Sequence, residues 1–202
     1  NKFDKIEMEI LRNNEVIGYN NYFFERDGET TTVKNQYKFE VKLLSATIFK
    51  VEGYGEEIYL NDHLISFQSK TLQNKKEKFV SLKLDKNKKK FNIKGSSYSG
   101  EASLKNIIGN WWSHKILQAE SQISPISGSI KEQLVTFIGK ENVAINGKEF
   151  ETDHFKLTSK DMSLPEDKRL NFDIWLDKKT SVIVKVTYER MGNWEYRLKN
   201  IE

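Results

Sequence analysis

The sequence predicts an all-β protein, mainly antiparallel, in which a strongly curved sheet forms a half-barrel or an incompletely closed barrel. Apolar and polar residues alternate along most of the 202 residues, and turn signals interrupt this alternation at intervals of roughly 8–12 residues. The pattern gives about ten strands, and a sheet of that size rarely stays open and flat because its edges would remain exposed. We expect residues 1–202 to form a single domain.

The C-terminal third shows the alternation most clearly. Apolar residues occupy every second position in three runs, 170–177, 182–189 and 194–199. Short turn clusters at 177–179 and 191–193 separate these runs. One apolar and one mostly polar face are typical of an antiparallel sheet with one side in water, so this region is predicted to be a three-stranded meander.

The N-terminal half repeats the same pattern, with strands expected near 6–10, 15–25 and 30–44. Asn-Gly is a strong signal for a two-residue hairpin, because both positions tolerate a positive φ. Turns are predicted at Asn13–Asn14, Arg26–Gly28, Gly53–Gly55, Asn61–Asp62, Gln73–Lys75, Asp85–Asn87 and Asn146–Gly147.

Residues 95–128 depart from the strand pattern. Within them, the apolar residues of LKNIIGNWWSHKILQ recur at spacings of three to five, which fit a helix better than a strand. Gly109 interrupts the run, so we expect one short helical segment near residues 104–118 rather than a long helix. The glycine- and serine-rich stretches on either side indicate loops. An apolar segment between two meanders is expected to cover the open mouth or concave face of the sheet.

The charge pattern argues against a nucleic-acid binder. The 33 basic and 29 acidic residues leave a net charge of +4, and Lys and Glu alternate along the same strands. A nucleic-acid binder usually gathers its basic residues on one face. The densest basic run, Lys86–Lys90, lies between two strand patterns and is interpreted as a solvated hairpin tip, with contact to an anionic membrane surface or polyanion as the alternative. The chain has no cysteine and no apolar stretch that approaches the roughly 20 residues of a membrane span.

No motif indicates catalysis, a metal or a cofactor. The chain contains no phosphate-binding glycine loop and no H-E-x-x-H. Its three histidines are far apart in sequence, and His63 and His154 are expected to face water. Carboxylates are plentiful, but nothing selects one glycosidase-type pair, which stays an open alternative. We therefore expect no catalytic residue, no metal ligands and no cofactor, and the chain is not expected to be an enzyme.

Trp111, Trp112 and His114 are the candidate ligand-binding residues. Adjacent side chains on a helix point about 100° apart, so one tryptophan could anchor in the sheet while the other stays at the lip of a cavity. Together with His114 they would form an aromatic wall for an apolar or sugar-like ligand. The alternative is that both tryptophans fill the core and His114 packs at the edge of the aromatic cluster.

Three segments follow one another in a characteristic order: YLNDHLISFQSKTLQNKKEKFVSLKLDKNKKKFNIKG, the SPISG loop, and FDIWLDKKTSVIVKVTYERMGNWEYRL. In this order, over about Lys5 to Leu198, the chain resembles a family of exported bacterial β-domains. That family is a domain of unknown function. The resemblance implies that this chain carries a signal peptide and is located in the envelope of a Gram-negative bacterium. The usual tight glycine turn of the family is replaced here by Asn74–Lys75. The family has no assigned catalytic residues, so none is carried over. A looser similarity of fold is to lipoprotein-localisation carriers, whose curved sheets hold acyl chains.

These observations leave two hypotheses for function. The first is a periplasmic or secreted monomer that binds or carries an apolar, lipid-like ligand in its curved sheet. The second is a structural or protein-interaction module of the cell envelope that binds no small molecule. The chain begins at Asn1 rather than Met, which fits a signal peptide removed before Asn1 or a boundary of other origin.

Overall fold

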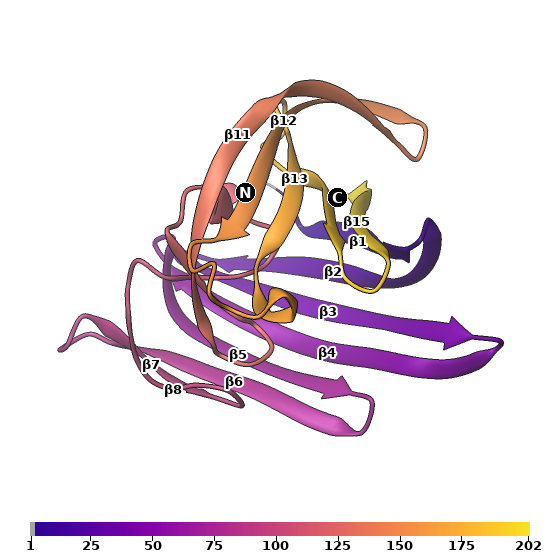
Figure 1. Ribbon diagram of the computed structural model, residues 1–202. Coiled ribbons are helices and arrows are strands. Elements are labelled where there is room, and N and C mark those ends of the chain that lie inside the picture. Colours follow the sequence, from indigo (N-terminus) through magenta and orange to yellow (C-terminus); the bar gives the residue numbers. More distant parts are fainter. Residues whose placement is uncertain (1–2) are drawn as a thin grey trace.

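The structure is a computed structural model that describes residues 3–202 (Figure 1). Asn1, the expected processing site, lies outside the described residues. The described part contains fifteen strands: β1 (Lys5–Arg12), β2 (Glu15–Asp27), β3 (Thr30–Leu43), β4 (Ala46–Leu60), β5 (His63–Gln73), β6 (Lys76–Asp85), β7 (Lys90–Gly95), β8 (Ser99–Ser103), β9 (Ile107–Ile108), β10 (Ser121–Ile123), β11 (Ile130–Ile145), β12 (Lys148–Ser159), β13 (Asn171–Asp177), β14 (Ile183–Glu189) and β15 (Asn193–Ile201). Two 3-10 helical turns complete it, η1 (His114–Leu117) and η2 (Glu166–Lys168). Neither turn has the length or apolar character of a helix that crosses a membrane.

All the described strands belong to one sheet, in the order β8-β7-β6-β5-β4-β3-β2-β1-β15-β14-β13-β12-β11-β10-β9. Every neighbouring pair is antiparallel except β9 and β10. The first and last strands pair in the middle of the sheet, where Ile10 lies opposite Tyr196. The sheet curves strongly but does not close into a barrel, as Figure 1 shows. The predicted fold class, an antiparallel, incompletely closed half-barrel, is therefore confirmed.

The two edge strands of the sheet, β8 and β9, follow each other in the sequence, and the SPISG loop between β10 and β11 contacts β5 and the β7–β8 connection. Ser97 N donates to Ser127 O at 2.9 Å, and Ser69 Oγ donates to Pro125 O at 2.5 Å. A Cβ on Gly95 would lie 2.5 Å from Ser127 O, so the loop approaches β7 closely only because that residue is a glycine. The loop thus ties the last strands of the N-terminal meander to the connection that leads into the C-terminal one.

Four apolar clusters form the described core, and three of them receive the middle of the chain. The first joins β1 to β3 with β11 and β13 to β15, the second lies on β5 to β10, and the third lies on β12 to β14 and η1. Their buried members include Ile6, Met8 and Leu198 in the first, Phe67, Leu82 and Ile93 in the second, and Leu157, Ile174 and Val186 in the third.

The short helical segment predicted near 104–118 is present as the four-residue turn η1, and the rest of this range is irregular apart from β9. Only η1 is helical, and β9 pairs with β10 instead of joining a helix. The apolar residues of this segment pack into different clusters: Ile108 into the second, Ile116 into the third, and Trp112 against the first. A single long helix would present these residues to one neighbour, whereas an irregular segment with one short helical turn lets them reach three clusters. Strands β8, β9 and β10 also lie within 95–128, a region that we expected to lack strands.

The turn predicted at Gly53–Gly55 is also wrong, because these residues lie in the middle of β4. Gly53 pairs with Tyr37, and a Cβ on Gly53 would lie 2.5 Å from Tyr37 Oη. The glycine therefore makes room for a tyrosine rather than for a turn. The actual turn before β4 is Leu44–Ser45, where both residues adopt positive φ.

Candidate ligand-binding site

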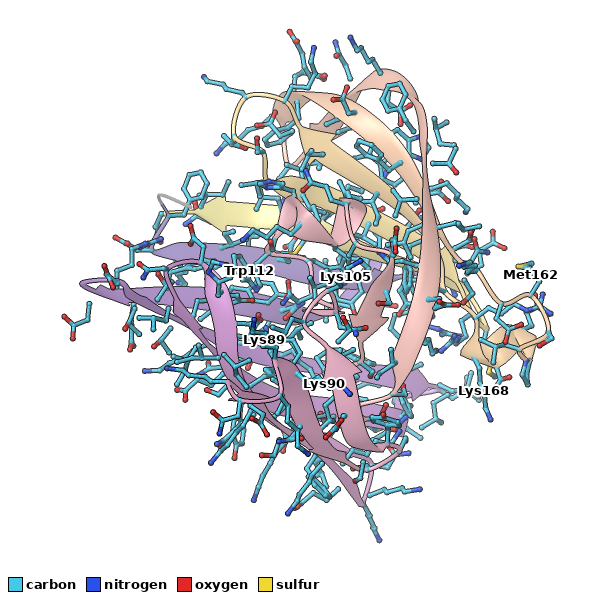
Figure 2. The ribbon with its side chains drawn as sticks, turned by 90° about the vertical axis from the view of Figure 1, so that its left-hand side faces the viewer. Lys89, Lys90, Lys105, Trp112, Met162 and Lys168 are labelled. Atoms are coloured by element: carbon cyan, nitrogen blue, oxygen red, sulfur yellow. The ribbon has the colours of Figure 1, made fainter. Side chains whose placement is uncertain are left out.

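The segment 109–118 crosses the inside of the curved sheet and is held there by buried polar groups. Figure 2 shows η1 inside the curve of the sheet, with Trp112 beside it. The first anchor is Tyr22 in β2, whose hydroxyl accepts the backbone N–H of Trp111 at 3.2 Å and the side-chain N–H of Asn20 at 3.0 Å. Burial raises the pKa of Tyr22 well above its usual value, so it stays a neutral phenol.

The second anchor is Glu57 in β4, which is only 3% exposed. Its Oε1 accepts Asn110 Nδ2 at 2.7 Å and Trp112 Nε1 at 2.9 Å, and its Oε2 accepts the Tyr59 hydroxyl. Burial raises the pKa of Glu57 to about 7, although the three donors oppose this shift. Glu57 was not among the residues predicted from the sequence, because its position in the alternation of β4, in phase with Tyr59, does not reveal its partners.

Trp111 and Trp112 point to different sides of this segment. The Trp111 ring packs edge-on against Phe172, with centroids 5.1 Å apart, and also contacts Tyr196. The Trp112 ring packs edge-on against Phe24 and Tyr59, at 5.4 and 5.8 Å. Both tryptophans are half-buried. Each tryptophan therefore fills part of the core and also lines a cavity. Features of both interpretations made from the sequence, a core-filling role and a cavity wall, are present.

Two adjoining cavities lie on the Trp111 side. The Trp111 cavity, of about 290 Å³, reaches from Tyr22 and Asn110 to Lys131. The Tyr188 cavity, of about 350 Å³, extends from Trp111 past Tyr188 towards the loop 160–170. The two share six lining residues, Trp111, Arg169, Leu170, Phe172, Arg190 and Tyr196.

A third cavity, of about 660 Å³, lies on the other side of the segment and is called the Trp112 cavity. Trp112, His114 and Lys115 line it together with Phe24. His114 is exposed at its lip. The structure thus brings Trp112 and His114 to one cavity and Trp111 to another, so the three predicted residues do not form one wall.

Three cationic side chains surround the Trp111 cavity: Lys131 from β11, Arg169 before β13, and Arg190 after β14. Lys131 Nζ donates to the backbone oxygen of Lys168, and Arg169 Nε donates to Leu164 O at 2.7 Å. None of the three forms an ion pair with another described residue of 3–202. No Asp or Glu of the described chain lines this cavity. Burial, together with the nearby Arg190, lowers the pKa of Lys131.

Asn110 adds an unsatisfied polar atom to the same cavity. The residue is 8% exposed and lines the Trp111 cavity, and its Nδ2 is used by Glu57. Its Oδ1 is buried without a hydrogen-bond donor among the described residues. Buried acceptors without partners are rare because they lose their hydration, so a ligand hydroxyl or amide, or water, would be favoured here.

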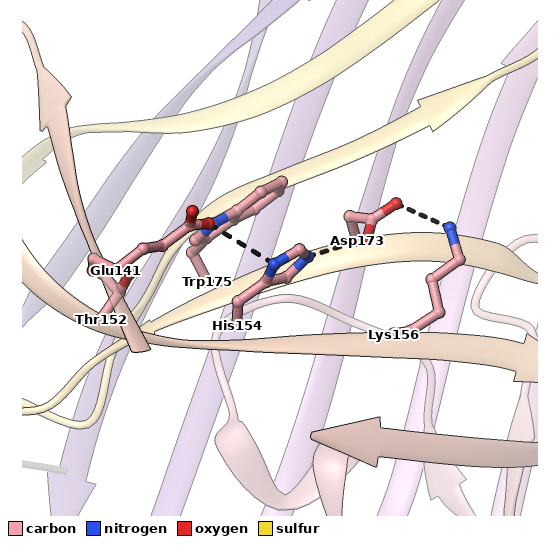
Figure 3. A network of polar contacts seen from close by, with 6 residues as sticks. All are labelled: Glu141, Thr152, His154, Lys156, Asp173 and Trp175. Atoms are coloured by element: carbon pink, nitrogen blue, oxygen red, sulfur yellow. Dashed lines mark hydrogen bonds and ion pairs between the residues drawn. The ribbon is translucent and has the colours of Figure 1, made fainter. Parts of the chain in front are cut away.

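A polar cluster on β11, β12 and β13 was also missed (Figure 3). His154, expected to face water, is largely covered because its ring stacks on Trp175 at 4.4 Å. Its Nε2 lies 2.8 Å from Asp173 Oδ1, and its Nδ1 lies 3.4 Å from Glu141 Oε1. Lys156 Nζ contacts Asp173 Oδ2 at 2.7 Å. Burial tends to raise the pKa of Asp173, but the hydrogen bonds from Lys156 and His154 outweigh it and the pKa is lowered.

This cluster does not form a binding site with the cavities. None of its side chains lines the Trp111, Tyr188 or Trp112 cavity in the described chain. Within residues 3–202, no group of three or more His, Asp or Glu side chains is arranged to hold a metal ion. The cluster is best explained as an ion-pair network that holds three neighbouring strands together.

Comparisons with known proteins agree with this fold. The chain is similar to a solved β-barrel-like protein of the domain of unknown function DUF1849 from Brucella abortus, with a TM-score of 0.64 and 11% identity. That match covers 98% of this chain and 95% of the other. A DUF1329 family protein from Desulfovibrio piger matches with 12% identity over 100% of this chain and 86% of the other, but its TM-score of 0.20 supports no argument.

No curated protein sequence matches the chain. A family model described as a domain of unknown function, DUF6134, matches residues 8–199. This extent agrees with the resemblance to a bacterial β-domain of unknown function that the sequence suggested. The chain therefore belongs to the DUF6134 family.

Proposed function

We propose that this chain binds an apolar, lipid-like ligand on the Trp111 side of its half-barrel, in the periplasm or after secretion. The observation that carries the proposal is the aromatic surface of Trp111, Phe172 and Tyr196, which lines two adjoining cavities. Mostly apolar cavities of a few hundred cubic ångströms with a few placed polar groups are recurrent sites for small molecules. The envelope location rests on the resemblance of the sequence to exported bacterial domains.

The Trp112 cavity supports this proposal less well. Trp112 is bound to Glu57 and enclosed by Phe24 and Tyr59, so its ring already has its partners. The Trp111 ring contacts Phe172 and Tyr196 and also borders open space on two sides. A ligand on the Trp111 side would therefore complete the burial of an aromatic surface, which favours binding.

A neutral apolar fluorophore, N-phenyl-1-naphthylamine, tests the proposal on the full chain. We expect its fluorescence to rise on binding, and Trp111→Ala to weaken the binding about tenfold because the variant removes the largest part of the aromatic surface. Phe137→Ala is the matched control, since Phe137 is exposed on β11 and lines none of these cavities. Equal binding by both variants, or none by the unaltered chain, would contradict the proposal.

A second candidate is a structural or protein-interaction module of the envelope, favoured by two exposed hairpin tips. Leu44 is 95% exposed and Met191 is 90% exposed, and both have positive φ. A bulky residue in that conformation is unusual and suggests a role for the tip. The tips lie at one end of the sheet, because Asn13 in the β1–β2 turn bonds Asn193 and the β3–β4 turn extends in the same direction.

Crosslinking in intact cells distinguishes this interaction role from the proposed ligand binding. A specific partner should be captured by the unaltered chain and lost from a Leu44→Ser, Met191→Ser variant, while Trp111→Ala should leave the capture unchanged. The two tips contribute little to the core, so the variant should fold normally. Capture that is insensitive to the tips would argue against this role.

A further inference from the structure

We propose that the ligand of the Trp111 cavity is an amphiphile with an anionic head, a carboxylate or phosphate, held by Lys131, Arg169 and Arg190. This inference rests on the proposed function and names the chemical class of its ligand. The three cations approach one cavity from three places in the chain, and no acidic residue in the described part lines that cavity.

Two of the three cations are held in place by backbone carbonyls, and all three keep donors available. The Lys168 carbonyl fixes Lys131, and the Leu164 carbonyl fixes the Nε of Arg169. The terminal nitrogens of Arg169 and the guanidinium of Arg190 form no hydrogen bond to any other residue that the structure describes. Planar guanidinium groups recognise carboxylates and phosphates through two parallel hydrogen bonds. Preplaced donors of this kind match an anion rather than a neutral polar group.

The mutual repulsion of the cations also favours an anion. The pKa of Lys131 is lowered by burial first and then by Arg190 and Lys168, while Asp167 acts in the opposite direction. Like charges gathered around a partly buried space repel each other, and an anion between them removes this repulsion. Elsewhere in the described chain, lysines of comparable position are paired with a carboxylate, as Lys156 is with Asp173.

The lining residues also indicate how the ligand is oriented. Beside the cations, the Trp111 cavity carries amide groups of Asn20, Asn35 and Gln122, which suit a polar head. The Tyr188 cavity adds Tyr188 and Met162 to the shared aromatic surface, which suits an apolar tail. Its acidic residues, Glu166 and Glu189, would repel an anion placed there. Figure 2 shows Met162 and Lys168 together at the end of the molecule away from Trp112.

Displacement of N-phenyl-1-naphthylamine by ligands of one chain length tests the inference. Dodecanoate, dodecyl phosphate and neutral 1-dodecanol are compared on the full chain, below the concentrations at which they aggregate. We expect the anions to bind at least about tenfold more tightly than dodecanol. A Lys131→Gln, Arg169→Gln, Arg190→Gln variant should lose that advantage and keep its affinity for dodecanol. The ratio of dodecanoate to dodecyl phosphate distinguishes a carboxylate from a phosphate head.

Two further variants keep the test sharp. Arg190→Gln alone changes an exposed side chain, so it should fold and still weaken the anions severalfold. The double variant Lys115→Gln, Lys179→Gln is the matched control. Both lysines line the Trp112 cavity, so this variant should bind the anions and dodecanol as the unaltered chain does. Equal binding of anions and dodecanol to every variant would overturn the anionic head and leave the proposed function standing. Binding of neither, together with no binding of the fluorophore, would overturn both.

Discussion

Trp111 and Trp112 are neighbours in the sequence but have different surroundings. The indole N–H of Trp112 donates to a buried carboxylate, and its ring is enclosed by Phe24 and Tyr59. The Trp111 ring packs on Phe172 and borders two cavities with cationic residues. We infer that Trp112 fixes the crossing segment, and this allows Trp111 to present its ring to a ligand.

The difference shows how an irregular segment can serve two purposes at once. The backbone bends at Trp111 and Trp112, whose rings pack against different neighbours, and polar groups of the sheet hold the segment at both residues. Tyr22 binds the backbone at Trp111, and Glu57 binds Asn110 and Trp112. Substitutions of Trp112, Trp111, Glu57 and Ser113, made one at a time, measure how much the segment depends on each residue.

Trp112→Ala should give the largest loss of stability. Truncation of a buried aromatic side chain costs about 3–5 kcal/mol; Trp112 is half-buried, so its packing loss lies near the lower end, but the variant also removes a donor from buried Glu57. Trp111→Ala should cost less, because it removes no hydrogen bond from a buried charged group. Urea unfolding of both variants measures the two free energies. Equal losses would contradict the assigned difference between the two tryptophans.

Glu57→Gln should change how stability depends on pH. The pKa of Glu57 is raised in the folded state, from 4.5 to about 7, so the folded protein holds this proton more tightly than the unfolded chain. The stabilisation is complete below about pH 4.5 and is lost as the pH rises to about 7, a change of about 3 kcal/mol. The glutamine does not titrate, so the difference between the two free energies of unfolding should vary by that amount across the window. A difference that is constant with pH would refute this assignment.

Ser113→Ala should have the smallest effect. Ser113 precedes η1, and its hydroxyl accepts the backbone N–H of Lys115 at 3.3 Å. Loss of such a cap costs about 0.5–1 kcal/mol. Thermal unfolding measures the change, and fluorophore binding at Trp111 should be unaltered because Tyr22 still holds the backbone there. Weakened binding would mean that η1, and not only Tyr22, positions Trp111.

The alternating pattern was sufficient to predict the strands of the C-terminal meander. The expected runs 170–177, 182–189 and 194–199 correspond to β13, β14 and β15 within a residue or so at their starts. Apolar and polar residues must alternate along a strand that has one face in water, so the local sequence alone shows this period. The turn prediction at Gly53–Gly55 failed because a glycine can also make room for a side chain of the neighbouring strand, here Tyr37.

The candidate site was only partly predictable. Trp111, Trp112 and His114 were identified because aromatic residues gathered where the strand pattern stopped. Glu57 occupies an ordinary alternating position, and no local feature shows that it lies under Trp112. The three cations come from separate parts of the chain, so only the curvature of the sheet brings them to one cavity.

By itself, the sequence determined an antiparallel, curved and incompletely closed sheet with an apolar, aromatic segment in its middle. These properties depend on periodicity and turn chemistry, which act over a few residues. The tertiary structure decided that β1 pairs with β15, that the middle segment is irregular apart from β9 and η1, and that its two tryptophans face different cavities. Such features depend on contacts between residues far apart in the chain, because the three apolar clusters that receive the segment exist only after the sheet has curved.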